Sequence, residues 1–136
     1  MRVFWDTNLF IYLIERHPVF HTRVLDLYRD SKQRGDVVVT SALTLGELMA
    51  QPLRLGRMDL VDRYAELLSR GRGIELIEFG QPAAEQYARI RAGTSLRQPD
   101  AIQFACAIAG GASVFVTNDQ RLWNVRVTGL ESVRGL

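Results

Sequence analysis

The feature of the sequence that most constrains the fold is a set of short runs in which successive residues, not alternate ones, are apolar. Residues 3–5 (VFW), 37–39 (VVV) and 114–116 (VFV) are such runs. Strands of a parallel sheet are covered by helices on both faces and therefore need apolar side chains at successive positions. These three runs predict buried parallel strands. Residues 74–79 (IELIEF) predict another strand, and residues 125–128 (VRVT) a weak edge strand.

Helical patterns occupy the intervals between the predicted strands. A first helix is expected to begin near Leu9, a turn between two later helices at residues 52–56, and a short loop at residues 71–73. Strands that alternate with helices predict an α/β sandwich with a mostly parallel sheet and right-handed crossovers. The remaining helices, predicted from apolar periodicity, prolines and capping residues, are residues 18–34, 43–51, 58–70, 82–92 and 99–109.

Length and composition suit one globular domain spanning residues 1–136. The chain is 47% apolar and 24% charged, and no linker or repeat interrupts it. No run approaches the roughly 18 apolar residues of a membrane span, and the first residues lack the layout of a secretory signal, so we expect a cytoplasmic protein. The single cysteine, Cys106, lies in an apolar helical pattern and is expected to be a core thiol. A formal net charge of +2 allows a nucleic-acid ligand without indicating one.

Three carboxylates follow predicted strands at comparable positions. Asp6 comes directly after the first strand, Asp119 follows residues 114–116 by way of Thr117 and Asn118, and Glu47 lies in the helix after the second strand. Because the carboxyl ends of parallel strands meet at one edge of a sheet, where ligands bind in open α/β folds, we expect these three acids near that edge. The strand rule does not place Asp100, which opens the helix before residues 114–116.

Each acid also has an ordinary structural explanation. Asp6 or Asn8 could cap the helix that begins near Leu9, and Asp119 could be a turn residue. Asp100 follows a proline at a helix start, where an acid is favoured. Glu47 is the hardest to explain in this way, because its helix carries little polar surface and an unpaired carboxylate there is costly.

Convergence of the acids would require a cation. Two carboxylates about 4 Å apart repel by about 4 kcal/mol at an effective dielectric constant near 20. Hard oxygen ligands without a partner cysteine or histidine favour Mg²⁺ or Mn²⁺ over zinc. His17 and His21 do not supply a zinc site, because Pro18 separates them and they are not expected to share a helix face.

Four segments, VFWDTNLFIYL, TSALTLGEL, QPDAIQFACAIAGGA and VFVTNDQRL, resemble the PIN-domain nucleases, in particular VapC-type toxins. Together they span residues 3–122, with an acid in each of four ordered contexts. The resemblance implies a three-layer α/β/α sandwich and a metal-dependent endoribonuclease whose catalytic residues are Asp6, Glu47, Asp100 and Asp119. It also implies a homodimer that a small antitoxin neutralises, as the toxin of a toxin-antitoxin pair.

The resemblance extends to supporting residues. It implies that Asp6, Asp100 and Asp119 hold one or two Mg²⁺ ions, while Glu47 acts through water or orients the nucleophile. Residues at positions where the family often has small polar side chains that support the acids are Asn8, Ser41 and Thr117, although a helix-capping role explains Ser41 equally well. Candidate contacts to the RNA backbone, each also explained as an ordinary surface charge, are Arg54, Arg57, Arg97 and Arg121.

Two other functions stay open from the sequence. An aspartyl-phosphate phosphatase also has an acid after its first strand, but it usually has a second acid two residues later, where this chain has Asn8, and Lys32 is the only lysine. A catalytically silent RNA-binding or scaffold protein with the same fold is the other alternative. The sequence does not indicate which RNA a nuclease of this type would cleave.

Overall fold

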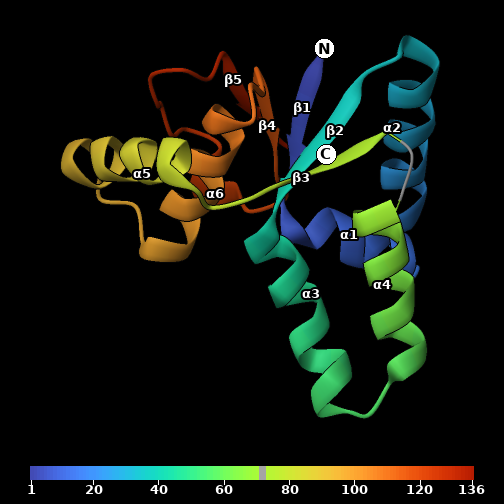
Figure 1. The fold of residues 1–136 in the computed structure, drawn as a ribbon. Coiled ribbons are helices and arrows are strands. Elements are labelled where there is room, and N and C mark those ends of the chain that lie inside the picture. The colour runs from blue at the N-terminus through green and yellow to red at the C-terminus, as the bar shows by residue number, and fades with distance from the viewer. Residues whose placement is uncertain (71–72) are drawn as a thin grey trace.

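A computed structural model describes residues 1–70 and 73–136, so most of the loop predicted at residues 71–73 lies outside the described residues. Its centre is a five-stranded sheet of order β3-β2-β1-β4-β5 in which every pairing is parallel (Figure 1). The strands are β1 Arg2–Trp5, β2 Val37–Ser41, β3 Ile74–Ile77, β4 Val114–Val116 and β5 Ser132–Arg134. The predicted parallel sheet is confirmed.

Successive residues of the central strands point to opposite faces of the sheet, and both faces are buried. In β1, Val3 and Trp5 join one core cluster, whereas Phe4 joins another. The register aligns Phe4 with Phe115 of β4, and their rings stack with centroids 4.8 Å apart. Burial of both faces explains why these strands are continuously apolar.

Helices cover each face of the sheet and complete the three layers. The first core cluster contains residues of α1 Thr7–Ile14, α2 His21–Arg34, α3 Ala42–Arg54 and α4 Met58–Arg70. The second cluster contains residues of α5 Gln81–Gly93 and α6 Gln98–Ala109 (Figure 1). The predicted α/β/α sandwich is therefore confirmed. None of the helices in the two described ranges is long and apolar enough to cross a membrane.

Three sequence predictions about element boundaries were wrong. Residues 125–128 form no strand; Val125 and Val127 pack on the second core cluster without strand pairing, and β5 lies further on, at Ser132–Arg134. Their apolar alternation reflects packing alone. The helix predicted from residue 18 begins at His21, because the backbone N–H groups of Val19 and Phe20, just before the helix, donate to the His17 ring. The predicted turn at residues 52–56 starts late, because α3 continues through Pro52 to Arg54.

Cys106 lies in the fully buried part of α6, as expected for a core thiol. Loss of hydration raises its pKa to about 11, so the thiol stays protonated at neutral pH. A nucleophilic role for this residue has no support from the structure.

Candidate functional site at the carboxyl edge of the sheet

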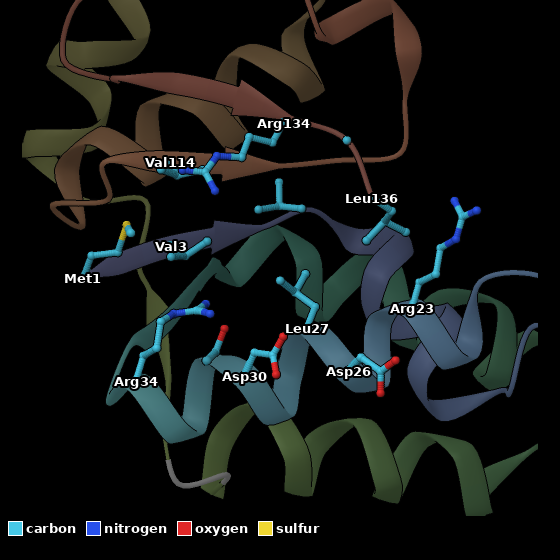
Figure 2. Close-up of a pocket in the computed structure, with 13 residues that line it drawn as sticks. Met1, Val3, Arg23, Asp26, Leu27, Asp30, Arg34, Val114, Arg134 and Leu136 are labelled. Carbon is cyan, nitrogen blue, oxygen red and sulfur yellow. The ribbon is translucent and has the colours of Figure 1, made fainter.

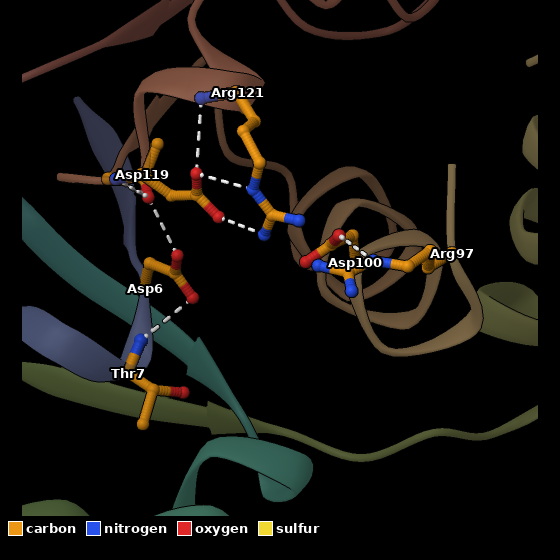
Figure 3. Close-up of polar contacts among 7 residues, drawn as sticks. Asp6, Thr7, Arg97, Asp100, Asp119 and Arg121 are labelled. Carbon is orange, nitrogen blue, oxygen red and sulfur yellow. Dashed lines mark hydrogen bonds and ion pairs between the residues drawn. The ribbon is translucent and has the colours of Figure 1, made fainter. Parts of the chain in front are cut away.

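Asp6 and Asp119 lie side by side where the strand order reverses. The chain winds outward from β1 through β2 to β3, then returns to β4 on the other side of β1. Figure 3 shows Asp6 and Asp119 next to each other. Thr117 joins the two acids, because its Oγ1 donates to Asp6 Oδ2 at 2.7 Å and accepts from the Asp119 backbone N–H at 3.0 Å. Such a reversal point is where open α/β sheets bind ligands.

Asp6 combines a structural role with an unusual electrostatic environment. Its Oδ1 accepts from the Thr7 backbone N–H at 2.9 Å, which makes it the N-cap of α1. Burial raises the pKa of Asp6; the hydrogen bonds from Thr117 and Thr7 oppose this effect, and the charges of Asp100 and Asp119 add to it. The capping explanation thus holds for Asp6 without excluding a chemical role.

Asp100 comes to the same edge through the direction of α6. At the end of this helix the Gly110 carbonyl accepts from Arg2 Nε at 2.7 Å, at the start of β1. The helix therefore begins toward the opposite edge, where β1 ends. Asp100 lies near the other acids, because its charge adds to the effect of burial in raising the pKa of both Asp6 and Glu47. Its own closest cation is Arg97, with Nε 3.9 Å from Oδ2.

Glu47 lies at the exposed margin of a polar network whose other members, Ser41, Thr44 and Gln103, are buried. Its Oε1 accepts from Thr7 Oγ1 at 3.0 Å and from Gln103 Nε2 at 3.2 Å. Gln103 also donates to Thr44 Oγ1 at 2.8 Å, and its Oε1 accepts a short hydrogen bond from the Ser41 hydroxyl. Burial is the main cause that raises the pKa of Glu47; the Thr7 hydrogen bond opposes it, and Asp6 and Asp100 add to it.

Gln103 and Thr44 were not predicted from the sequence. The signal for Gln103 was present, because it is a polar residue three positions after Asp100 and so lies near the same helix face. The Ser41 hydroxyl also accepts from the Thr44 backbone N–H at 3.1 Å, so Ser41 caps α3, as the capping explanation expects. It makes its short hydrogen bond to Gln103 and not to an acid. Asn8 is exposed and, within the described residues, makes no hydrogen bond to the acids.

Arg121 makes a two-point ion pair with Asp119. Its Nε donates to Oδ1 at 3.0 Å, its Nη2 makes a short hydrogen bond to Oδ2, and its backbone N–H donates to Oδ1 at 3.1 Å. Figure 3 shows the guanidinium on the side of Asp119 that faces Asp100. The Arg121 hydrogen bond is the largest cause that lowers the pKa of Asp119. The same hydrogen bond is the largest cause that raises the pKa of Arg121, and the charges of Asp119 and Asp100 add to it.

The sequence was compared with models of known protein families. A family model described as the PIN domain matches residues 3–127, which is nearly the whole chain. The chain belongs to the PIN domain family. The resemblance of the four acid-bearing segments is thereby confirmed at the level of the family.

Solved structures share the fold of this PIN domain at low sequence identity. The VapBC complex of Salmonella typhimurium bound to DNA aligns with a TM-score of 0.75 and 23% identity, over 99% of this chain and 98% of that one. VapBC2 of Rickettsia felis bound to a promoter DNA fragment aligns with a TM-score of 0.71 and 21% identity, over 99% of this chain and 98% of that one. VapC20 of Mycobacterium tuberculosis, described as a Sarcin-Ricin loop cleaving toxin, aligns with a TM-score of 0.65 and 20% identity, over 83% of this chain and 86% of that one. No curated protein is significantly similar in sequence.

The donor set of this PIN domain fits a hard divalent cation. Asp6, Asp100 and Asp119 offer carboxylate oxygens. Burial is the largest cause that raises the pKa of Asp6, and the charges of Asp100 and Asp119 add to it. As the side chains stand, no group of three acidic, histidine or cysteine residues in residues 1–70 and 73–136 is close enough to hold a metal together. Arg121 supplies positive charge at the same place.

The other predicted arginines of the PIN domain lie around or away from the acids. Arg97 reaches Asp100, but Arg54 donates to Gln51 on α3, and Arg57 pairs with Asp59 at the start of α4. Arg54 and Arg57 therefore make no hydrogen bond or ion pair with the four acids in the described part of the chain.

Two cavities lined by residues of the described part of the PIN domain leave Asp6 and Asp119 out of their lining. A cavity of about 400 Å³ lies between α2 and strands β1 and β4, with Arg34 and Arg134 at its margin and none of the four acids in its lining (Figure 2). A smaller cavity of about 280 Å³ is lined by apolar residues of α1, α3 and α4 together with Glu15, Glu47, Gln51 and Arg57.

Proposed function

We propose that this PIN domain is a divalent-cation-dependent endoribonuclease and the toxin of a toxin-antitoxin pair. The observation that carries the proposal is the proximity of Asp6, Glu47, Asp100 and Asp119, which come from separate segments of the chain, at the reversal point of a parallel sheet. A structural role alone does not require four carboxylates to share one sheet edge, where like charges repel.

In this proposal Asp6, Asp100 and Asp119 hold Mg²⁺ or Mn²⁺. Bound there, the ion would polarise a phosphodiester oxygen and lower the pKa of a coordinated water. Thr117 holds one Asp6 oxygen and the Asp119 backbone, so it keeps the Asp119 main chain beside the Asp6 carboxylate. The cap to α1 fixes the other Asp6 oxygen.

Glu47 is proposed to orient and deprotonate the attacking water. Thr7 and Gln103 both donate to Oε1, which leaves Oε2 as the oxygen available to accept a proton. Burial raises the pKa of Glu47, and a carboxylate with a raised pKa is a stronger base. Arg97, whose side chain is mostly exposed beside Asp100, is proposed to contact the RNA phosphates, as are Arg54, Arg57 and Arg121.

The RNA substrate and the antitoxin partner are proposed from the descriptions of the solved structures that share this fold. One similar structure is described as a Sarcin-Ricin loop cleaving toxin, two as VapBC bound to DNA, and one, from Klebsiella pneumoniae, as a toxin-antitoxin complex. By the same likeness we propose a cytoplasmic homodimer that a small antitoxin protein inhibits. Size-exclusion chromatography with light scattering on the purified chain tests the dimer.

The activity test compares Asp6→Asn and Asp119→Asn with the wild type on total RNA. Asparagine is also a good N-cap, so Asp6→Asn keeps the cap of α1 while removing the charge. We expect both variants to lose Mg²⁺-dependent cleavage, and Asp59→Asn, an exposed acid on α4, to retain it. Full activity in either site variant would refute the proposal.

The same preparations separate the rival functions. Hydrolysis of an aryl phosphate without RNA cleavage would indicate a phosphatase. RNA binding that EDTA does not change, without cleavage of any transcript, would indicate a silent binding protein. Mapping cut sites after brief expression would identify the RNA target.

A further inference from the structure

Arg121 occupies the acids as a cation would. Three hydrogen bonds from this one residue engage both carboxylate oxygens of Asp119. Its guanidinium also faces Asp100 (Figure 3). A divalent ion at the proposed site would need the same Asp119 oxygens and would be repelled by the guanidinium beside them.

We propose that Arg121 is a built-in counter-cation that competes with the divalent ion for Asp119, so that the ion binds only as Arg121 moves away. This inference rests on the cation site of the proposed function. Before an ion binds, the positive charge of Arg121 reduces the repulsion among the acids. The same charge makes ion binding weaker than it would be with the acids alone.

The position of Arg121 suits such an exchange. Its side chain is 59% exposed, and it lies in the short helical turn Gln120–Leu122, so the guanidinium can leave without disturbing the core. Leu122, not Arg121, anchors that turn in the second core cluster. Exposed ion pairs are weak, so a divalent ion at millimolar concentration can displace the arginine.

The chain offers a matched control in Arg57. It makes the same two-point contact with an acid two residues away, with Nε 3.0 Å from Asp59 Oδ1 and Nη2 2.9 Å from Oδ2. This second pair is also exposed, but Asp59 is not among the proposed cation ligands. Removal of Arg57 therefore reports the general effect of losing one positive charge from the surface.

The experiment measures Mn²⁺ affinity of the full chain, without RNA, from the electron paramagnetic resonance signal of free Mn²⁺. We expect Arg121→Gln to bind Mn²⁺ about two- to tenfold more tightly than the wild type, since it removes both a competing pair and a nearby positive charge. Arg121→Lys keeps the charge but loses the fork and should be intermediate. Arg57→Gln should match the wild type, and thermal unfolding checks that all variants are folded.

Two results would overturn the inference while the proposed function stands. Equal Mn²⁺ affinity in the wild type and Arg121→Gln would show that the arginine does not compete. Weaker binding in Arg121→Gln would show that it holds Asp119 in place for the ion. Absence of Mn²⁺ binding in every variant would contradict the proposed cation site itself, and with it this inference.

Discussion

Replacing Thr117 with valine isolates the contact that joins the two central acids. Thr117 is fully buried, and its hydroxyl lies 2.7 Å from Asp6 Oδ2. Valine has nearly the same shape, so the substitution removes hydrogen bonds without opening a large cavity. A hydrogen bond to a charged group contributes about 1.5–3 kcal/mol. We expect Thr117→Val to lower the free energy of unfolding at pH 7 by about 2–3 kcal/mol.

The loss should depend on pH in a defined direction. Burial raises the pKa of Asp6, so the folded chain binds more protons than the unfolded chain near that pKa, and the contribution of Asp6 to stability falls as pH rises. Thr117 offsets that fall by stabilising the ionised carboxylate. Near pH 4, where Asp6 is more protonated, the missing hydrogen bond is closer to a neutral one and costs about 0.5–1.5 kcal/mol.

Urea denaturation of the wild type, Thr117→Val and Thr117→Ser at pH 7 and pH 4 measures both effects. Serine keeps the hydroxyl and should recover most of the stability that valine loses at pH 7. The loss caused by valine should be larger at pH 7 than at pH 4. A loss of the same size at both pH values would refute the claim that Thr117 stabilises an ionised Asp6.

Two further predictions concern buried groups. Gln103→Leu leaves the hydroxyls of Ser41 and Thr44 and the Glu47 carboxylate with fewer partners, so it should lower the free energy of unfolding by about 2–4 kcal/mol. The control Gln81→Leu, on the exposed surface, should change the free energy of unfolding little. A loss below about 0.5 kcal/mol for Gln103→Leu would contradict the network. Cys106, buried and with its pKa raised to about 11, should resist iodoacetamide at pH 8 until urea unfolds the chain, and alkylation of the folded chain at the unfolded rate would contradict that burial.

Much of the fold follows from the sequence because the central strands are buried on both faces. That burial requires apolar residues at successive positions, which residues 3–5, 37–39 and 114–116 display. The edge strand Ser132–Arg134 carries no such pattern, since its residues are at best half-buried. Residues 125–128 imitate a strand because Val125 and Val127 both pack on the core.

The positions of the acids follow from the sequence only in part. Asp6 and Asp119 sit directly after parallel strands, so a rule of sheet topology brings them together. Asp100 starts a helix whose position depends on how the chain crosses the sheet, and only the family resemblance supplied it. The pairing of Arg121 with Asp119 depends on the local geometry of a short turn, which no sequence pattern reports.

The central claim, that acids distant in the chain share one cation site, is tested most directly by anomalous diffraction from crystals soaked in Mn²⁺. The account predicts an anomalous peak at the carboxyl edge of the sheet within coordination distance of Asp6 and Asp119, and its loss in Asp6→Asn crystals. A Mn²⁺ peak elsewhere with none at that edge, at concentrations that saturate binding, would contradict it.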